Sequence, residues 1–418
     1  MIRAADLLPY IKRNTSTYEL FTDRTTRKAN KMNRIYIFTG KGGVGKSSVA
    51  AAHAYKSAES GKKTLLVSTD MAHNLGDIFE CELSHEKKTV MENLDIYEID
   101  PAYVCENDFA EIIRYAKKLL SDTGDITIQD IGIFPGTEEL FSLLKIAEIY
   151  KSGEYGRIIV DCAPTGETLS LLKFPELLSW YMEKLFPIGK VGVRVLAPIS
   201  KSAFKVEMPN KHAMNDIEKI YAKLMELENL LKDRNTTSVR IVSVPEKMVV
   251  EETKRNYMYM NLYNFNVDGI YINRILPEDM GNDFFDKWIE LQKEYRTVLK
   301  DTFAGLPIYE IPWYDEELKG IANIKRLAED VLKDEAVFDS KAVTERETFE
   351  KTGDDYLLKV FMPCADKADL DLYQAATDVV IKAGNFKRNI PLPNTLLNMS
   401  IKKADYTDGY LNILFTKE

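Results

Sequence analysis

The pattern of hydrophobic and polar positions divides the chain into three stretches. Between about residues 34 and 335, short apolar and β-branched runs such as RIYIFT, TLLVS and RIIVD alternate with longer segments of helical periodicity. Continuous apolar runs of this length are typical of buried parallel strands, and apolar residues at every third or fourth position are typical of amphipathic helices. The alternation predicts an α/β fold with a mostly parallel, doubly wound sheet.

Beyond this stretch the period of the pattern changes. Residues 336–351 are largely charged, and we interpret them as a linker. Residues 352–418 contain DYLLKVFMP, DVVIKAG, FKRNIPLP and a turn signal at Asp408-Gly409. Short strands bounded by such turns predict a small all-β sandwich domain.

Residues 1–33 precede the first predicted strand and are rich in Lys, Arg and Thr. Three alternatives are open: an ordered extension with a short amphipathic start, a mobile tail or upstream-start artefact, and an organelle transit peptide. Acidic residues within the segment argue against the transit peptide.

Composition narrows the class of protein. The chain has 418 residues, 45% of them hydrophobic and 29% charged, with a formal net charge of -9. This balance is typical of a soluble protein and argues against nucleic acid as a partner. The four cysteines lie far apart without a CxxC pair, and no apolar run is long enough to span a bilayer. We therefore expect a cytoplasmic protein.

The segment FTGKGGVGKSSVA, from Phe38 to Ala50, joins a predicted strand to a predicted helix. It matches the P-loop pattern G-x-x-x-x-G-K-[ST]. The backbone N–H groups of such a loop surround phosphate oxygens, and the helix start adds its positive dipole end. Lys46 would neutralise the β- and γ-phosphates, and the Ser47 hydroxyl would join the shell of a Mg²⁺ ion.

Two aspartates follow other predicted strands. Asp70 ends KKTLLVSTD and Asp161 ends GRIIVD. Groups beyond the carboxyl ends of parallel strands face the ligand crevice of an open α/β sheet. Asp161 is therefore placed to hold a Mg²⁺-bound water, whereas a lone strand-end aspartate such as Asp70 is more often a helix cap.

Five motifs in this order, GKGGVGKSS, STDMAHNLGD, DCAPTGETL, SVPEKMVVEET and GIYINRILP, resemble the ArsA family of ATPases. The family includes the arsenite-pump ATPase and the ATPase that targets tail-anchored proteins to membranes. The resemblance covers about residues 33–335. It implies an ATPase with ATP and Mg²⁺ as cofactors, acting as a homodimer.

The resemblance also explains why the P-loop carries two lysines. Lys41 is similar to the signature lysine of a deviant Walker A loop, which reaches across the homodimer interface to the partner's nucleotide. A second cation would spread the charge that develops during phosphoryl transfer. The alternative is a solvated surface lysine.

By the same resemblance Asp70 would polarise the attacking water as part of the switch I motif. The chain departs from the family pattern at Met71, where relatives have Pro. In switch II it carries Glu167 and Ser170 where relatives commonly have His and Arg. Nucleotide-coupled motion is therefore expected to be wired differently.

Three further residues resemble the family's adenine-side positions. Asn273, at the end of GIYIN, offers the donor and the acceptor that adenine recognition needs. Glu246 resembles a nucleotide-proximal residue, and Pro312 resembles a wall of the base pocket. The alternative for Asn273 is a turn residue after a strand. The predicted nucleotide-binding residues are Gly40, Lys41, Gly42, Gly43, Val44, Gly45, Lys46, Ser47, Ser48, Glu246, Asn273 and Pro312.

The segment from about residue 174 to 233 is too long for a simple crossover and predicts a helical insert. In relatives that handle membrane proteins, this region holds a client's transmembrane helix. The apolar face of PELLSWYMEKLF provides the candidate client groove, formed by Leu177, Tyr181, Met182, Leu185 and Phe186. Packing of this stripe within the protein is the alternative.

The C-terminal stretch resembles the α-crystallin-like (small heat-shock-protein-like) domain appended to some ArsA-family proteins. Such a domain could bind apolar segments or dock on the ATPase. The predicted function is a homodimeric ATPase that binds and releases a hydrophobic protein segment, with tail-anchored clients and a membrane receptor as candidate partners. Two alternatives are the motor of an arsenite pump and a regulatory switch of the MinD or ParA kind. An iron–sulfur reductase role for Cys162 is disfavoured.

Overall fold

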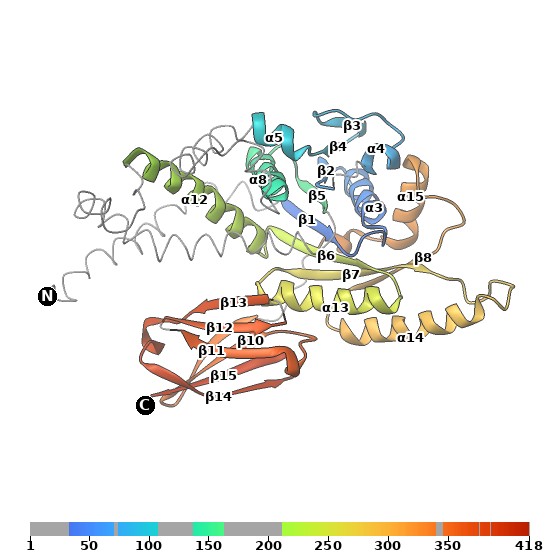
Figure 1. Cartoon of the computed structure of the whole chain (residues 1–418). Helices are drawn as coiled ribbons and strands as arrows, with labels where there is room; N and C mark the ends of the chain where they lie inside the picture. Colours follow the sequence, from blue (N-terminus) through green and yellow to red (C-terminus); the bar gives the residue numbers. More distant parts are fainter. Residues whose placement is uncertain are drawn as a thin grey trace, which may run out of the picture.

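The structure is a computed structural model that describes residues 33–70, 74–107, 137–162, 211–339, 346–375, 377–384 and 386–417 (Figure 1). An eight-stranded sheet with helices on both faces forms the larger part. A smaller antiparallel β domain follows it in the chain. Both match the fold class predicted from the hydrophobic pattern.

The large sheet has the strand order β3-β4-β2-β5-β1-β6-β7-β8. All neighbouring strands are parallel except the edge strand β3, which pairs antiparallel with β4. The strands are β1 Arg34–Thr39, β2 Thr64–Ser68, β3 Lys88–Met91, β4 Leu94–Glu98, β5 Arg157–Asp161, β6 Thr237–Ser243, β7 Val267–Ile275 and β8 Ile308–Pro312. The central strands are almost entirely buried, as expected for apolar runs covered on both faces.

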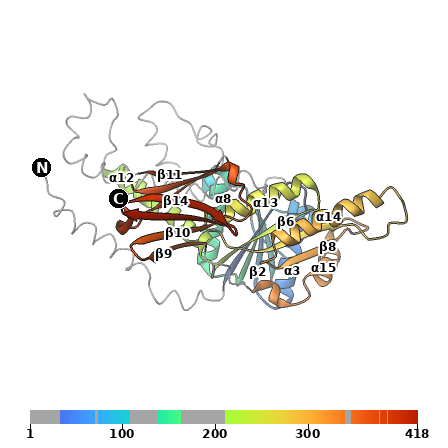
Figure 2. The same cartoon turned by 90° about the horizontal axis from the view of Figure 1, so that it is seen from below.

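Two separate hydrophobic clusters cover the faces of this sheet. One contains buried residues of α3, α4 and α15, and the other contains residues of α8, α12 and α13. Figures 1 and 2 show this layered arrangement. The helices are α3 Lys46–Glu59, α4 Asn74–Ile78, α5 Pro101–Asn107, α8 Thr137–Ser152, α12 Lys211–Lys232, α13 Lys247–Leu262, α14 Asp286–Thr302 and α15 Gly320–Val331.

Only the last part of the predicted helical insert falls in the described residues. It forms α12, whose C-terminal half buries Leu224, Leu227 and Leu231 in the core. The candidate client groove at Leu177, Tyr181, Met182, Leu185 and Phe186 lies outside the described residues. No helix in the described ranges is both long and apolar enough to cross a membrane.

The C-terminal domain consists of two antiparallel sheets, β14-β15-β10-β9 and β11-β12-β13. Inward-facing side chains alternate along its strands, as in β10, where Leu358 and Val360 are fully buried. The elements are β9 Glu347–Thr352, β10 Asp355–Phe361, η4 Lys367–Asp369, β11 Leu370–Ala375, β12 Asp378–Ala383, β13 Phe386–Pro391, η5 Asn394–Leu396, β14 Met399–Thr407 and β15 Tyr410–Lys417.

This domain packs on α13, and its core residues belong to the same hydrophobic cluster as those of that helix (Figure 1). The Tyr263 hydroxyl donates to the Lys387 carbonyl at 2.9 Å. The Arg388 guanidinium donates to the Leu262 carbonyl and, at 2.7 Å, to Glu347. Apolar contact and buried hydrogen bonds thus fix the β domain on the larger one.

The expected linker at residues 336–351 is partly ordered structure. The short helix η3, Glu335–Phe338, buries Val337 and Phe338 under the large sheet. The Tyr36 hydroxyl donates to the Phe338 carbonyl at 2.5 Å. At the other end, β9 begins at Glu347, inside the expected linker. The charged residues of this segment are compatible with β9 because β9 is an edge strand with exposed positions.

Candidate nucleotide site

The predicted P-loop connects the carboxyl end of β1 to the first turn of α3. Gly40 has φ +154, and a Cβ atom there would lie 2.1 Å from the Val242 carbonyl oxygen. Gly45 has φ +93, and a Cβ atom there would lie 2.3 Å from Nδ2 of Asn273. Only glycine fits both places, because the loop passes close to the ends of β6 and β7.

The first turn of α3 is suited to an anion. Gly45 is the N-cap residue, and no side chain caps the helix or places an acidic group in its first turn. The N–H groups of that turn and the positive end of the helix dipole are therefore available to a phosphate.

The two lysines of the loop have different surroundings. Lys46 is buried, and its Nζ donates to the carbonyl oxygen of Lys41 at 3.3 Å. The Lys41 side chain is partly exposed, and its Nζ lies 3.7 Å from a carboxylate oxygen of Glu252 on α13. Lys46 thus stays within its own loop, whereas Lys41 lies at the surface.

Asp161 ends β5 next to the P-loop, and its register partners are Phe38 of β1 and Ser68 of β2. Its side chain is fully buried, and within the described residues no donor lies within 3.5 Å of either carboxylate oxygen in hydrogen-bonding geometry. Burial raises the pKa of Asp161 to about 6, helped by the charge of Asp70 and opposed by the nearby Ser47 hydroxyl and Lys46.

A buried carboxylate without hydrogen bonds is rare, and it fits a cation site. With the Ser47 hydroxyl close by, the oxygen donors at this point suit the water-rich shell of Mg²⁺. Asp161 and Ser47 are therefore the residues that would hold the ion.

Asp70 follows β2, on the neighbouring strand, and is partly buried. Its backbone N–H donates to the Ser68 hydroxyl at 3.1 Å, and the N–H of Thr69 donates to the Asp161 carbonyl at 3.0 Å. These bonds fix the backbone leading to Asp70 against the end of β5. Residues 71–73, with Met71, and the switch II positions Glu167 and Ser170 lie outside the described residues.

Asn273 contacts the P-loop itself. Its Nδ2 donates to the Val44 carbonyl at 2.8 Å, and its Oδ1 accepts from the N–H of Arg274 at 2.8 Å. Both ends of the amide are therefore engaged by backbone in this structure. Contact with the adenine edge stays a prediction and would require one of these bonds to open.

Glu246 and Pro312 lie at the same edge of the sheet. Glu246 is the exposed N-cap residue of α13, directly after β6. Pro312 is the exposed last residue of β8, and the next N–H, of Trp313, donates to the Ile275 carbonyl at 2.8 Å. The predicted nucleotide residues thus lie at or just after the carboxyl ends of the neighbouring strands β1, β6, β7 and β8.

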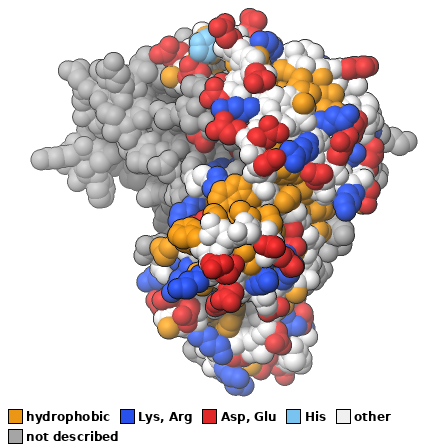
Figure 3. All heavy atoms as spheres, turned by 90° about the vertical axis from the view of Figure 1, so that its right-hand side faces the viewer, with side chains coloured by type: hydrophobic (Ala, Val, Ile, Leu, Met, Phe, Trp, Pro, Cys, Tyr) orange, Lys and Arg blue, Asp and Glu red, His pale blue; other side chains and the backbone are white. Residues whose placement is uncertain are grey.

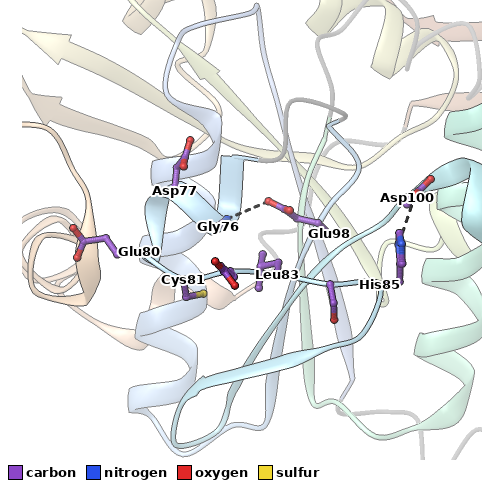
Figure 4. A pocket seen from close by; sticks show the side chains of 10 residues that line it. Gly76, Asp77, Glu80, Cys81, Leu83, His85, Glu98 and Asp100 are labelled. Atoms are coloured by element: carbon purple, nitrogen blue, oxygen red, sulfur yellow. Dashed lines mark hydrogen bonds and ion pairs between the residues drawn. The ribbon is translucent and has the colours of Figure 1, made fainter.

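One polar residue at this edge of the sheet, Glu98, belongs to none of the sequence motifs. Glu98 ends β4, is 8% exposed, and accepts two backbone hydrogen bonds from α4, the helix after Asp70 (Figure 4). The available signal was an acidic residue at the end of the apolar strand LDIYE. The same kind of pattern, in RIIVD, indicated Asp161 on β5.

Comparison with known proteins gives two family matches. A family described as anion-transporting ATPase matches residues 33–333, and one described as an HSP20-like domain found in ArsA matches residues 353–415.

Individual relatives match over most of the chain. A protein named putative arsenical pump-driving ATPase 1 from Aquifex aeolicus is 32% identical over 386 residues, which cover 89% of this chain and 97% of that protein. A putative arsenical pump-driving ATPase from Chlorobaculum tepidum is 33% identical over 394 residues, covering 92% and 96%. ATPase GET3C from Arabidopsis thaliana is 28% identical over 330 residues, covering 72% and 82%.

Proposed function

The chain belongs to the ArsA family and is an ATPase, and from this premise we propose that it works as a Mg²⁺-dependent homodimer that binds and releases a hydrophobic protein segment. The observation that carries the nucleotide part is the buried, unpaired carboxylate of Asp161 beside Ser47 and the P-loop. The observation that carries the client part is the HSP20-like domain packed on α13.

Each residue of the site has a role in this proposal. The P-loop backbone and Lys46 bind the phosphates, and Asp70 orients the attacking water. Mg²⁺, when bound by Ser47 and Asp161, neutralises charge on the phosphate oxygens. Lys41 leaves Glu252 and contacts the partner's nucleotide. Its present ion pair is partly exposed and therefore weak, so little free energy opposes that movement.

The face that would meet a second subunit has apolar character. Met248 lies in the first turn of α13, Phe284 lies between β7 and α14, and Trp313 follows β8. All three side chains are exposed. Figure 3 views the side on which the loop before α14 projects, and hydrophobic side chains form a band there between charged ones. Such a band favours association over a purely solvated face.

The dimer can be tested by mixing inactive subunits. We expect Lys46→Ala and Lys41→Ala each to lower the rate of ATP hydrolysis by roughly 10³-fold or more. In an equal mixture, half of the dimers carry one variant of each kind, and one of their two sites keeps both lysines. Activity should then recover to roughly a quarter of the wild-type value, as isologous pairing requires. A mixture that stays inactive would contradict action of Lys41 in trans.

The client is tested with a defined probe. A soluble carrier ending in a 20-residue Leu/Ala helix should co-purify with an Asp70→Asn variant held in ATP, as roughly 20 apolar residues make one membrane span. The matched control is the same carrier with two Lys residues in that helix. Binding of neither carrier would contradict the proposal.

A second candidate is the motor of an arsenical pump, which the names of the Aquifex and Chlorobaculum relatives favour. This function predicts ATP hydrolysis that rises with arsenite or antimonite in the absence of any peptide. In the part of the chain that the structure describes, no cluster of three His, Cys, Asp or Glu residues could hold a metal ion. Measuring ATP hydrolysis with and without arsenite separates the two candidates.

A further inference from the structure

Glu98 ties the strand β4 to the helix α4. Its Oε1 accepts from the backbone N–H of Leu75 at 2.7 Å and from that of Gly76 at 3.1 Å. The residue is only 8% exposed. In Figure 4 its side chain points at the first turn of α4, whereas Glu80 points away. A buried carboxylate with two N–H donors makes strong, geometrically defined hydrogen bonds.

The packing of α4 is one-sided, which makes this tie important. Leu75, Ile78 and Phe79 are buried in the cluster that contains α3. Another side of the helix borders an open cavity of about 740 Å³, lined by Gly76, Asp77, Glu80 and Glu98 among others. The helix has five residues and cannot be stable on its own. Its position therefore depends on the apolar contacts with α3 and on Glu98.

The segment tied in this way is the one that carries Asp70. Upstream, the N–H of Asp70 is held by Ser68 and the N–H of Thr69 by the Asp161 carbonyl. Downstream, the backbone N–H groups of Leu75 and Gly76 at the start of α4 both donate to Glu98. Hydrogen bonds thus fix the backbone at Asp70 and again at Leu75 and Gly76.

We propose that Glu98 is a positioning residue for ATP hydrolysis, which holds α4 and thereby sets where Asp70 lies relative to Asp161 and the P-loop. The proposal rests on the role proposed above for Asp70. Its two hydrogen bonds named above both go to α4, so we infer that Glu98 acts through the helix that follows β2 in the chain. Small misplacements of a catalytic group are expensive in rate.

The test compares Glu98→Ala with Glu98→Gln. The alanine variant removes the acceptor, and we expect kcat for ATP hydrolysis to fall roughly 10- to 100-fold while KM for ATP changes less than about threefold. Glutamine keeps an acceptor oxygen at the same reach, so this variant should keep kcat within about fivefold of wild type. Hydrogen exchange of the amides in residues 74–78 should quicken in Glu98→Ala and much less in Glu98→Gln.

Asp100 provides a matched control. It lies two residues further along, and its Oδ1 accepts from the N–H groups of Ala102 at 2.9 Å and Tyr103 at 3.1 Å, in the first turn of α5. Asp100→Ala removes the same number of hydrogen bonds from a different helix. It should leave kcat and the exchange of residues 74–78 close to wild type.

Two outcomes would overturn the proposal. One is unchanged amide exchange over residues 74–78 in Glu98→Ala, which tests the tie without any use of ATP. The other is an equal fall in kcat for Glu98→Ala and Asp100→Ala, which would show a general loss of stability. If Glu98→Ala fails to fold, Glu98→Asp takes its place, because the shorter side chain should also quicken amide exchange over residues 74–78. Glu98→Gln should then keep both the exchange rate and kcat close to wild type. If instead Asp70→Asn retains full activity, the proposed role of Asp70 fails, while the exchange result still reports on the tie.

Discussion

Two buried charges in the same sheet have opposite surroundings. Asp161, at the end of β5, accepts no hydrogen bond on either carboxylate oxygen from the part of the chain that the structure describes. Arg240, within β6, uses all three guanidinium nitrogens: Nε donates to Asp268 at 3.2 Å, Nη1 to the Tyr271 hydroxyl at 3.3 Å, and Nη2 to the Val337 carbonyl. Both side chains are almost completely buried.

The pKa values of the two groups follow these surroundings. Burial alone would lower the pKa of Arg240, but the electrostatic interactions with Tyr271 and Asp268 outweigh burial and raise it. The guanidinium therefore stays charged. Burial also disfavours the charge of Asp161, and here nothing in the described structure outweighs it. The paired charge fixes the fold, whereas the unpaired one carries a cost in stability that a bound cation would remove.

The hydrogen bonds of Arg240 continue into α3. His53 donates from Nδ1 to the Val49 carbonyl, as a carbonyl can only accept, so its Nε2 accepts from the Tyr271 hydroxyl at 2.8 Å. Burial, followed by the charge of Arg240, lowers the pKa of His53 well below its usual value. The neutral imidazole is thus part of a structural network and not a pH-sensitive group near neutrality.

The largest effect is expected on breaking the paired charge. Arg240→Met leaves Asp268 buried without its partner, and we expect the free energy of unfolding to fall by about 3–5 kcal/mol. Urea denaturation followed by circular dichroism measures this. Arg326→Met is the control, because its ion pairs with Asp315 and Glu316 are exposed and should matter by less than about 1 kcal/mol. A similar small loss in both variants would remove the basis of the comparison.

Neutralising the unpaired charge should have the opposite sign. Asp161→Asn removes the buried charge, and we expect the free energy of unfolding, measured without nucleotide or Mg²⁺, to rise by up to about 3 kcal/mol while ATP hydrolysis is lost. Thermal denaturation and an ATPase assay measure the two effects.

Asp95 is the matched control for this change. It is equally a buried carboxylate of the sheet, but it accepts from Lys63 at 2.6 Å, Thr89 at 2.6 Å and Tyr155 at 2.9 Å. Burial would raise the pKa of Asp95, yet these bonds lower it overall. Asp95→Asn should therefore lower stability. A gain in both variants would mean that hydrogen bonding does not separate the two carboxylates.

The pH dependence gives a sharper form of the same contrast. The folded-state pKa of Asp161, about 6, exceeds the ordinary value of 3.8, so the folded protein binds the extra proton between those values. Stability contributed by that proton is fully present below pH 4 and is lost as the pH rises through 6. Wild type and Asp161→Asn should be about equally stable near pH 4 and diverge by up to about 3 kcal/mol at pH 7. Parallel stability curves across this range would show that Asp161 titrates normally.

The smallest effect concerns a neutral bond at the joint with the β domain. Tyr263→Phe removes the hydroxyl that donates to the Lys387 carbonyl, and we expect the free energy of unfolding to fall by about 1 kcal/mol. Tyr406→Phe removes a similar bond to the Met362 carbonyl inside the β domain. Only the first variant should speed limited proteolysis between the two domains. Equal rates of proteolysis in the two variants would show that the Tyr263 hydrogen bond contributes little to holding the domains together.

The contrast also marks what the sequence could predict. Strand-end aspartates and the glycine-rich loop are local patterns, so the fold and the convergence of Asp70, Asp161 and Lys46 followed from them. Arg240 stands in the strand segment VRIVSV, and its partners come from β7 and from Val337, almost a hundred residues further on. No local pattern specifies such contacts. The position of Glu98 at a strand end was a local signal, but its bonds to α4 depend on a helix that folds back on β4, and no local pattern specifies them.

Local sequence patterns also failed to predict which contacts a segment or a side chain makes in the folded protein. Residues 336–351 are charged enough to suggest a linker, but two of them, Val337 and Phe338 at the end of η3, have buried apolar side chains. The adenine role of Asn273 shows a similar limit: the residue type predicted its hydrogen-bonding capacity, while the partner in the structure is the Val44 carbonyl.

The helix α13 has 16 residues, which at 1.5 Å per residue is about 24 Å of rigid rod. Glu246 is the N-cap residue of this helix, and Glu252, six residues further on, lies beside the P-loop residue Lys41. The other end of the helix leads into Tyr263, whose hydroxyl bonds to the β domain. A tilt of this rod would carry a change of nucleotide across the molecule mechanically. The distance between a fluorescent label on the β domain and one on α3 would then change when a nucleotide binds to the P-loop.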